Sequence, residues 1–341
     1  MITTTSRSTG GTRTTQGSDF TIGFSAPACA CCTVLLSLLS LTSSGCSWMS
    51  SFSQRQVMES KSLAKRARSA EQSGNHRQAE EMLLEAIQKS PDDGELQLQL
   101  AKSYLSNGEK VLGLAALEAA AEVQPENQEI YKLWAQTLIE DGRYDDALRP
   151  LKLGLNQDPA YIELWMLKGY CEEQAERYQQ AFDSYQRVVQ NAPEHSAARV
   201  RMAQIQIHWG RPSLAAPLLR AALQDANLAE ERRAEAWWLL GVVYGQEKRW
   251  HDAIHALKKG IKETDELGPE KAYRLAYAEY QAGNYDAAGK QADELLARHP
   301  DHQPTKLLLQ VLQMNDPASA SAADAIVQTS FSSDLVPPRG W

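Results

Sequence analysis

Cysteine is scarce in this chain of 341 residues, and it is unevenly placed. Four of the five cysteines lie in the first 46 residues, namely Cys29, Cys31, Cys32 and Cys46. Only Cys171 lies beyond them. A single cysteine can form neither a disulfide framework nor a cysteine-ligated zinc site, so the body of the chain must be stabilised by packing alone.

A surplus of basic residues is also absent. The chain has 35 Lys and Arg against 43 Asp and Glu, which gives a net charge of −8 and a pI of about 5.5. Domains that bind nucleic acids through phosphates carry a basic face. The composition therefore argues against a nucleic-acid partner.

Motifs of common catalytic sites are missing as well. The sequence contains no P-loop, no G-x-G-x-x-G after a predicted strand, no G-x-S-x-G and no H-E-x-x-H. His251 and His255 lie four residues apart on a predicted helix, but no third ligand stands at a standard spacing from them. We therefore predict no catalytic residue, no metal, no cofactor and no small-molecule substrate. The acid pairs Asp145-Asp146 and Glu172-Glu173 are expected on solvated helix faces.

Long apolar runs are limited to one segment near the N-terminus. No charged residue occurs between Phe20 and Gln54, and the most apolar part runs from Ala28 to Leu41. A membrane-spanning helix needs about 20 apolar residues. This run is shorter and contains several serines, so it fits the apolar region of an export signal better.

The apolar run is followed by Ser43-Ser44-Gly45-Cys46. Small residues directly before a cysteine, after a leucine-rich run, resemble the signal of a bacterial lipoprotein. The resemblance implies that residues 1–46 form an export segment and that Cys46 carries the lipid anchor. Residues 47–59 would then be a flexible tether. An uncleaved anchor helix over residues 20–46 is the alternative.

Four prolines stand 34 residues apart: Pro91, Pro125, Pro159 and Pro193. A small residue keeps the same interval through Ala79, Gly113, Ala147, Ala181 and Ala215. A period of this length is typical of stacked helix-turn-helix units. Proline ends the second helix of a unit because it cannot continue a helix. Small residues are needed where the two helices of a pair approach closely.

One stretch makes the repeat type specific. Trp237-x2-Leu240-Gly241-x2-Tyr244, followed by Ala253 and Leu257, resembles the tetratricopeptide pattern. The resemblance covers residues 60–302 in seven repeats: 60–93, 94–127, 128–161, 162–195, 196–229, 234–268 and 269–302. It implies an all-α, right-handed superhelical solenoid of antiparallel helix pairs.

Four extra residues near Glu230 to Arg233 shift the register before the sixth repeat.

The C-terminal end of the array is predicted from composition. Residues 303–314 are rich in leucine and predict a helix that caps the last repeat. Residues 315–341 are rich in Ala, Ser and Pro and predict a disordered tail.

In tetratricopeptide proteins the first helix of each repeat lines a concave groove. By that resemblance the groove of this chain is apolar and aromatic in its later repeats, with basic character near Arg68, Lys102 and Lys132. The predicted groove residues are Met166, Tyr170, Trp238, Val242, Tyr273, Tyr277 and Tyr280. Such a surface suits an extended or helical peptide with hydrophobic anchors. The alternative is that several of these residues pack against neighbouring repeats or the chain's own tail.

The sequence therefore predicts a non-catalytic scaffold for protein or peptide partners, exported and tethered to a membrane on the periplasmic side of the cell envelope. A soluble, cytoplasmic adaptor, or an accessory subunit of an enzyme complex, is the alternative if the N-terminal segment is not an export signal.

Overall fold

The computed structural model describes residues 54–262 and 268–314. The predicted export segment with Cys46, most of the predicted tether and the predicted tail therefore lie outside the described residues. The array of helices belongs to one compact unit that begins at Glu59.

All regular structure among the described residues is helical, which confirms the predicted all-α fold. A helix over residues 54–72 comes first. It is followed by α2 (His76–Lys89), α3 (Gly94–Ser106), α4 (Lys110–Val123), α5 (Gln128–Glu140), α6 (Tyr144–Gln157), α7 (Ile162–Gln174), α8 (Tyr178–Asn191), α9 (Ser196–His208), α10 (Pro212–Leu223), α11 (Glu230–Gln246), α12 (Trp250–Lys262), α13 (Pro269–Gln281), α14 (Tyr285–Arg298) and α15 (Gln303–Met314).

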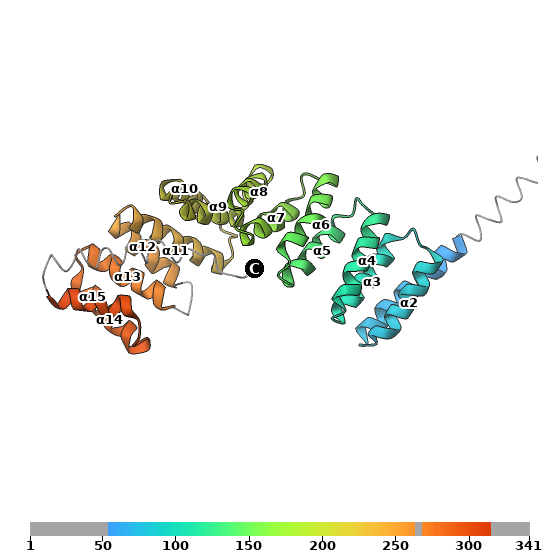
Figure 1. Cartoon of the computed structure of the whole chain (residues 1–341), viewed down its shortest axis with the longest axis horizontal. Helices are drawn as coiled ribbons and strands as arrows, with labels where there is room; N and C mark the ends of the chain where they lie inside the picture. Colours follow the sequence, from blue (N-terminus) through green and yellow to red (C-terminus); the bar gives the residue numbers. More distant parts are fainter. Residues whose placement is uncertain (1–53, 263–267, 315–341) are drawn as a thin grey trace, which may run out of the picture. The chain divides into compact units, whose positions relative to one another are not determined.

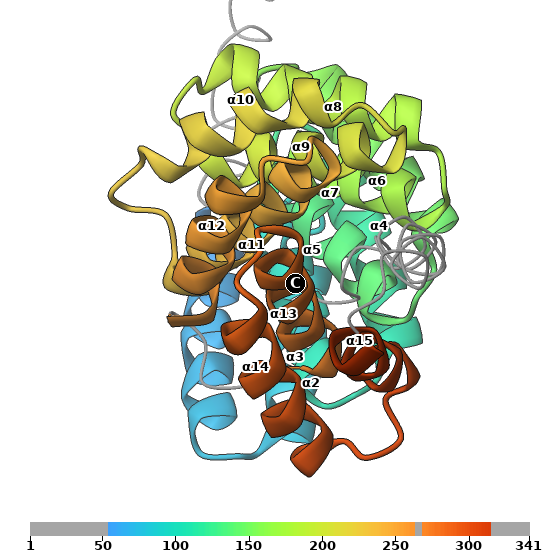
Figure 2. The same cartoon turned by 90° about the vertical axis from the view of Figure 1, so that its left-hand side faces the viewer.

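Each helix packs against the next helix in the chain, as Figure 1 shows for α2 to α14. The first helices of consecutive repeats also meet directly, α5 against α7 and α9 against α11. The last helix, α15, packs on α14 and touches α13 (Figure 2). Such neighbour-only contacts are the defining property of a solenoid.

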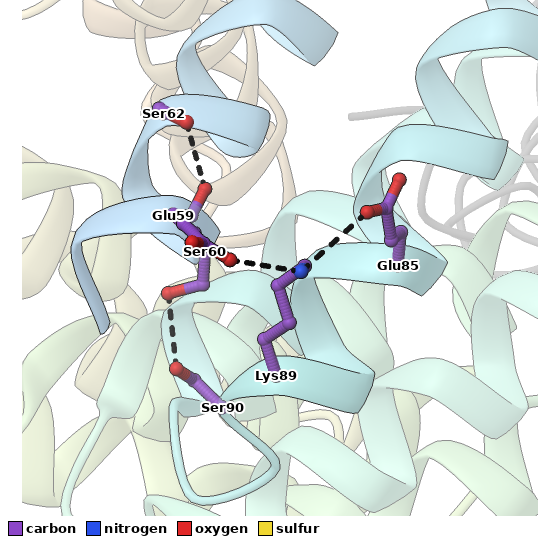
Figure 3. Close-up of polar contacts among 6 residues, drawn as sticks. All are labelled: Glu59, Ser60, Ser62, Glu85, Lys89 and Ser90. Carbon is purple, nitrogen blue, oxygen red and sulfur yellow. Dashed lines mark hydrogen bonds and ion pairs between the residues drawn. The ribbon is translucent and has the colours of Figure 1, made fainter. Parts of the chain in front are cut away.

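The first helix is joined to α2 by polar contacts at their ends (Figure 3). Lys89 Nζ lies 3.0 Å from Glu59 Oε2 of the first helix, and 3.7 Å from Glu85 Oε1 of its own helix. Ser90 Oγ donates to Ser60 Oγ at 3.0 Å. These contacts fix the position of the first helix, which carries Arg68.

The small residues of the 34-residue period lie where helices approach most closely. Ala79, Ala147, Ala181 and Ala215 are fully buried. A Cβ atom at Gly113 would lie 2.5 Å from Leu105 Cδ2 of the preceding helix. Larger side chains at these positions would separate the helices, which is why the period is visible in the sequence.

The four extra residues before the sixth repeat extend a helix and do not lengthen a loop. α11 has 17 residues, whereas α9 and α13 have 13 each. The added residues Glu230 to Arg233 form the first turn of α11. Two acids there, Glu230 and Glu231, interact favourably with the positive end of the helix dipole.

Candidate functional site

The candidate binding surface lies on the first helices of the repeats. It is defined by the ninth residue of each 13-residue first helix and by the equivalent residue of the two longer ones, and we name it the first-helix face. Its residues are Arg68, Lys102, Gln136, Tyr170, Gln204, Val242 and Tyr277. In the first three repeats these side chains are exposed, and from the fourth repeat onward they are buried. The open part of the face therefore lies in repeats one to three.

Five of the seven predicted groove residues are core residues in the structure. Val242 and Tyr273 are only 0% and 1% exposed, and Met166, Tyr170 and Tyr277 are also buried. Trp238 and Tyr280 keep some exposed surface. This placement corresponds to the alternative interpretation, in which the residues pack against neighbouring helices.

The burial of the later groove residues has a clear cause in the last repeat. Val242, Tyr273 and Tyr277 form one core cluster with Leu295 of α14 and Leu308 of α15. The Trp250 and Tyr277 rings meet edge to face, with centroids 5.8 Å apart. Such contacts are favourable beyond the burial of area. Burial also raises the pKa of Tyr273, and it raises the pKa of Tyr170, on α7, to about 12.

The open part of the first-helix face carries basic and amide groups. Arg68 Nε donates to Gln99 Oε1 at 3.3 Å, across the first two repeats. Lys132, one turn before Gln136 on α5, pairs with Glu129 on its own helix. Lys102 is exposed and makes no ion pair with any residue that the structure describes. Its ammonium group is available to an external acceptor.

The expectation that Glu172 and Glu173 lie on a solvated face was wrong, because both are only 3% exposed. Ser184 Oγ donates to Glu172 Oε2 at 2.6 Å, and Tyr185 OH donates to Glu173 Oε2 at 2.8 Å. The two acids lie at the end of α7, where the helix turns back and packs against α8. Buried carboxylates are tolerated there because hydrogen bonds and charges satisfy them. Asp145 and Asp146 are exposed, as expected.

The Glu173 carboxylate begins a buried polar network that crosses three repeats. Arg201 Nη1 lies 3.6 Å from Glu173 Oε1 and 3.4 Å from Gln204 Oε1. Gln204 Nε2 donates to Glu235 Oε1 at 2.7 Å. Desolvation by burial raises the pKa of Glu173, and the nearby Arg201 and the Tyr185 hydroxyl oppose that shift. The network links α7, α8, α9 and α11, so it serves repeat-to-repeat packing.

The two histidines spaced four residues apart lie on α12 with exposed side chains. The ring of His255 packs edge-on against Trp237, with centroids 6.4 Å apart. Within residues 54–262 and 268–314, no three His, Cys, Asp or Glu side chains are grouped so that they could hold a metal ion. The same residues include no helix with both the length and the hydropathy needed to span a membrane.

Cys171 is a testable marker of the core. Its side chain is 0% exposed, and burial raises the pKa of the thiol to about 12. Only the thiolate is nucleophilic. We expect iodoacetamide at about pH 8 to leave Cys171 unmodified in native protein and to alkylate it in concentrated urea, as measured by mass spectrometry of its peptide. Rapid labelling in native buffer would show that α7 opens locally.

The repeat family is established by comparison with known proteins. Models described as tetratricopeptide repeat match residues 64–129 and 202–269, residues 113–169, and residues 163–195 and 272–302. Together they cover most of the array. The chain belongs to the tetratricopeptide-repeat family.

Individual relatives agree with this assignment. The tetratricopeptide repeat-containing protein trd-1 of Caenorhabditis elegans is 24% identical over 245 residues, which are 70% of this chain and 30% of that protein. A tetratricopeptide repeat protein 30 homolog of Caenorhabditis briggsae is 30% identical over 100 residues, 29% of this chain and 15% of that protein. The chain therefore spans less than a third of the length of these relatives.

Two solved structures share the fold. The pilF protein of Pseudomonas aeruginosa superimposes with a TM-score of 0.52 at 15% identity, over 65% of this chain and 97% of that one. YrrB, described as a TPR protein with an unusual peptide-binding site, superimposes with a TM-score of 0.50 at 20% identity, over 58% of this chain and 98% of that one. Both likenesses concern the fold alone.

Proposed function

We propose that this protein is a non-catalytic scaffold that binds peptide segments of partner proteins. Tetratricopeptide proteins generally mediate protein–protein interactions, and scaffolds of this family are generally not enzymes. The observation that carries the proposal is the open part of the first-helix face, where three consecutive repeats expose Arg68, Lys102 and Gln136. Such a face offers several side chains in a row to an extended or helical peptide.

The predicted groove residues divide into two roles under this proposal. Trp238 and Tyr280 keep exposed surface and remain candidates for contact with a partner. Met166, Tyr170, Val242, Tyr273 and Tyr277 hold the helices of the later repeats together. Alanine at these five positions would reduce stability first, so it cannot test partner binding cleanly.

Charge reversal on the open face tests the proposal. The full-length protein carrying Arg68→Glu and Lys102→Glu is affinity-purified from its native cells, beside the wild type. We expect the co-purifying partner to be lost from this variant, because a rim charge that is reversed repels its former acceptor. The matched control is Lys152→Glu with Lys290→Glu, two exposed lysines on second helices α6 and α14. Equal recovery of the partner from both double variants would refute binding at this face.

We further propose that the scaffold is tethered to a membrane of the cell envelope through a lipid on Cys46. The support is the sequence pattern of an apolar run followed by small residues and Cys46. We expect labelled palmitate to enter the wild type and not Cys46→Ala, and the variant to leave the membrane fraction. Retention of an unlabelled variant in the membrane would instead indicate an anchor helix over residues 20–46. Recovery of both forms in the soluble fraction would indicate the soluble adaptor.

A further inference from the structure

The seventh repeat lacks an aromatic residue at a position that is aromatic in the third, fourth and sixth repeats, whereas the second and fifth repeats carry polar residues there. The fourth residue of α5 is Tyr131, and the fourth residue of α7 is Trp165. Trp237 holds the same position in α11, whose helix begins one turn earlier. All three are packed into the core clusters beside them. In α13 the fourth residue is Ala272.

A cavity of about 240 Å³ lies beside Ala272. Apolar side chains of three helices line it: Ile261 of α12, Leu275 of α13 and Leu295 of α14. Its polar lining consists of Gln291, Glu294 and Arg298 of α14 and His299 just after it. The cavity is therefore a pocket open to solvent on one side, with an apolar floor and one wall of polar groups that includes both acceptors and donors.

The cavity occupies the place of an indole ring in the preceding repeat. Lys259, the tenth residue of α12, has its Nζ 4.3 Å from the centroid of the Trp237 ring. The tenth residue of α14 is Glu294, which lines the cavity. The same pair of positions thus encloses a ring in the sixth repeat and an empty volume in the seventh.

The size and chemistry of the cavity favour an aromatic side chain with a hydrogen-bond donor. An apolar cavity of about 150 Å³ already accepts benzene, so the larger volume here leaves room for a fused ring. Gln291 Oε1 is buried and accepts no hydrogen bond within the part of the chain that the structure describes. An unsatisfied buried acceptor is unfavourable, and an indole N–H is a donor that could satisfy it.

We propose that this cavity is a docking pocket for a tryptophan side chain presented by a partner protein. In the bound state the indole ring lies between α12, α13 and α14, and its N–H donates to Gln291 Oε1. The proposal rests on the proposed scaffold function but concerns a second site, remote in sequence from Arg68 and Lys102.

The test uses N-acetyl-5-fluorotryptophanamide as the probe and the full chain as the receptor, with binding followed by broadening of the fluorine NMR line. We expect saturable binding to the wild type. Ala272→Trp fills the pocket from within, so we expect it to weaken binding at least tenfold and to raise the melting temperature. Methylation of the indole nitrogen of the probe removes the donor, and we expect roughly three- to tenfold weaker binding.

Controls separate the possible outcomes. Gly289→Ala changes the same helix at a site where an added Cβ meets nothing within 4 Å, and we expect it to bind the probe as the wild type does. If Ala272→Trp does not fold, as judged by circular dichroism, Ala272→Leu replaces it.

Absence of binding to the wild type, or equal binding to the filled variant, overturns the proposal. Tighter binding to Trp341→Ala would overturn the assignment to a partner, because the chain's own tryptophan would then be the occupant. None of these measurements depends on Arg68 or Lys102, so failure here leaves the scaffold proposal to its own test.

Discussion

Replacing Arg201 with methionine is expected to lower the free energy of unfolding by about 3 kcal/mol. Methionine keeps the volume of the apolar stem and removes the charge. The Glu173 carboxylate, 3% exposed and 3.6 Å from Arg201, would then be left buried without its cation. Urea denaturation of the full chain, followed by circular dichroism, measures the loss.

Two further variants identify the cause of that loss. Arg201→Met combined with Glu173→Gln should recover most of the stability, because removing both charges of a buried pair is often nearly neutral. Arg220→Met changes an exposed arginine on α10 and should stay within about 0.5 kcal/mol of the wild type. If Arg201→Met alone were as stable as the control Arg220→Met, water would already solvate Glu173.

The Glu173–Arg201 pair also leads to a prediction about how stability depends on pH. Burial raises the pKa of Glu173 in the folded state above its ordinary value of 4.5. The contribution of such a group to stability is fully present below the unfolded pKa and is lost as pH rises through the folded pKa. Loss of Arg201 removes an interaction that lowers this pKa. The loss of stability caused by Arg201→Met should therefore shrink as the pH is lowered from neutrality, because Glu173 with its raised pKa takes up a proton before an ordinary glutamate does.

Gly260→Ala is expected to lower the free energy of unfolding by about 1–3 kcal/mol, although alanine is the better helix former. A Cβ at this position in α12 would lie 2.9 Å from the Ala234 carbonyl oxygen and 3.0 Å from the Trp238 backbone nitrogen. Both atoms belong to the backbone of α11. Backbone cannot move aside as a side chain can, so the two helices would have to separate.

The opposite result is expected for the same substitution one repeat later. Gly289 lies inside α14, and a Cβ there would meet nothing within 4 Å. Gly289→Ala should therefore raise the free energy of unfolding by about 0.5–1 kcal/mol. Thermal and urea denaturation of Gly260→Ala and Gly289→Ala measure the change in the free energy of unfolding for each. Stabilisation by both would show that α11 and α12 can shift at little cost.

The fold could be predicted because its signals are local and repeated. The prolines at the 34-residue interval follow the ends of second helices, small residues mark close approaches, and glycine marks turns with a positive φ angle, as at Gly142. Glu176 and Lys248 adopt the same left-handed conformation in the turns of the fourth and sixth repeats, with φ of 59° and 58°. Those two turns lack the glycine signal, yet they form because the helices on either side pack together.

The candidate sites could be predicted only in part. The repeat pattern identifies which residues belong to first helices, but it does not say whether a side chain faces solvent or a neighbouring repeat. Tyr170 and Gln136 hold equivalent positions, and one is buried whereas the other is exposed. Glu172-Glu173 and Asp145-Asp146 look alike in sequence, and only the structure shows that neighbouring helices bury the glutamates and not the aspartates.

By itself the sequence determined the class of protein, the number and order of the helical pairs and the close approach at each small residue. Those features depend on the period of apolar and small residues along one chain segment, which local geometry converts directly into helices and turns. Only the tertiary structure decided which part of the first-helix face is open, which acids are buried, and that Ala272 leaves a pocket. Each of these depends on what neighbouring helices place beside a residue, and burial is a property of that neighbourhood.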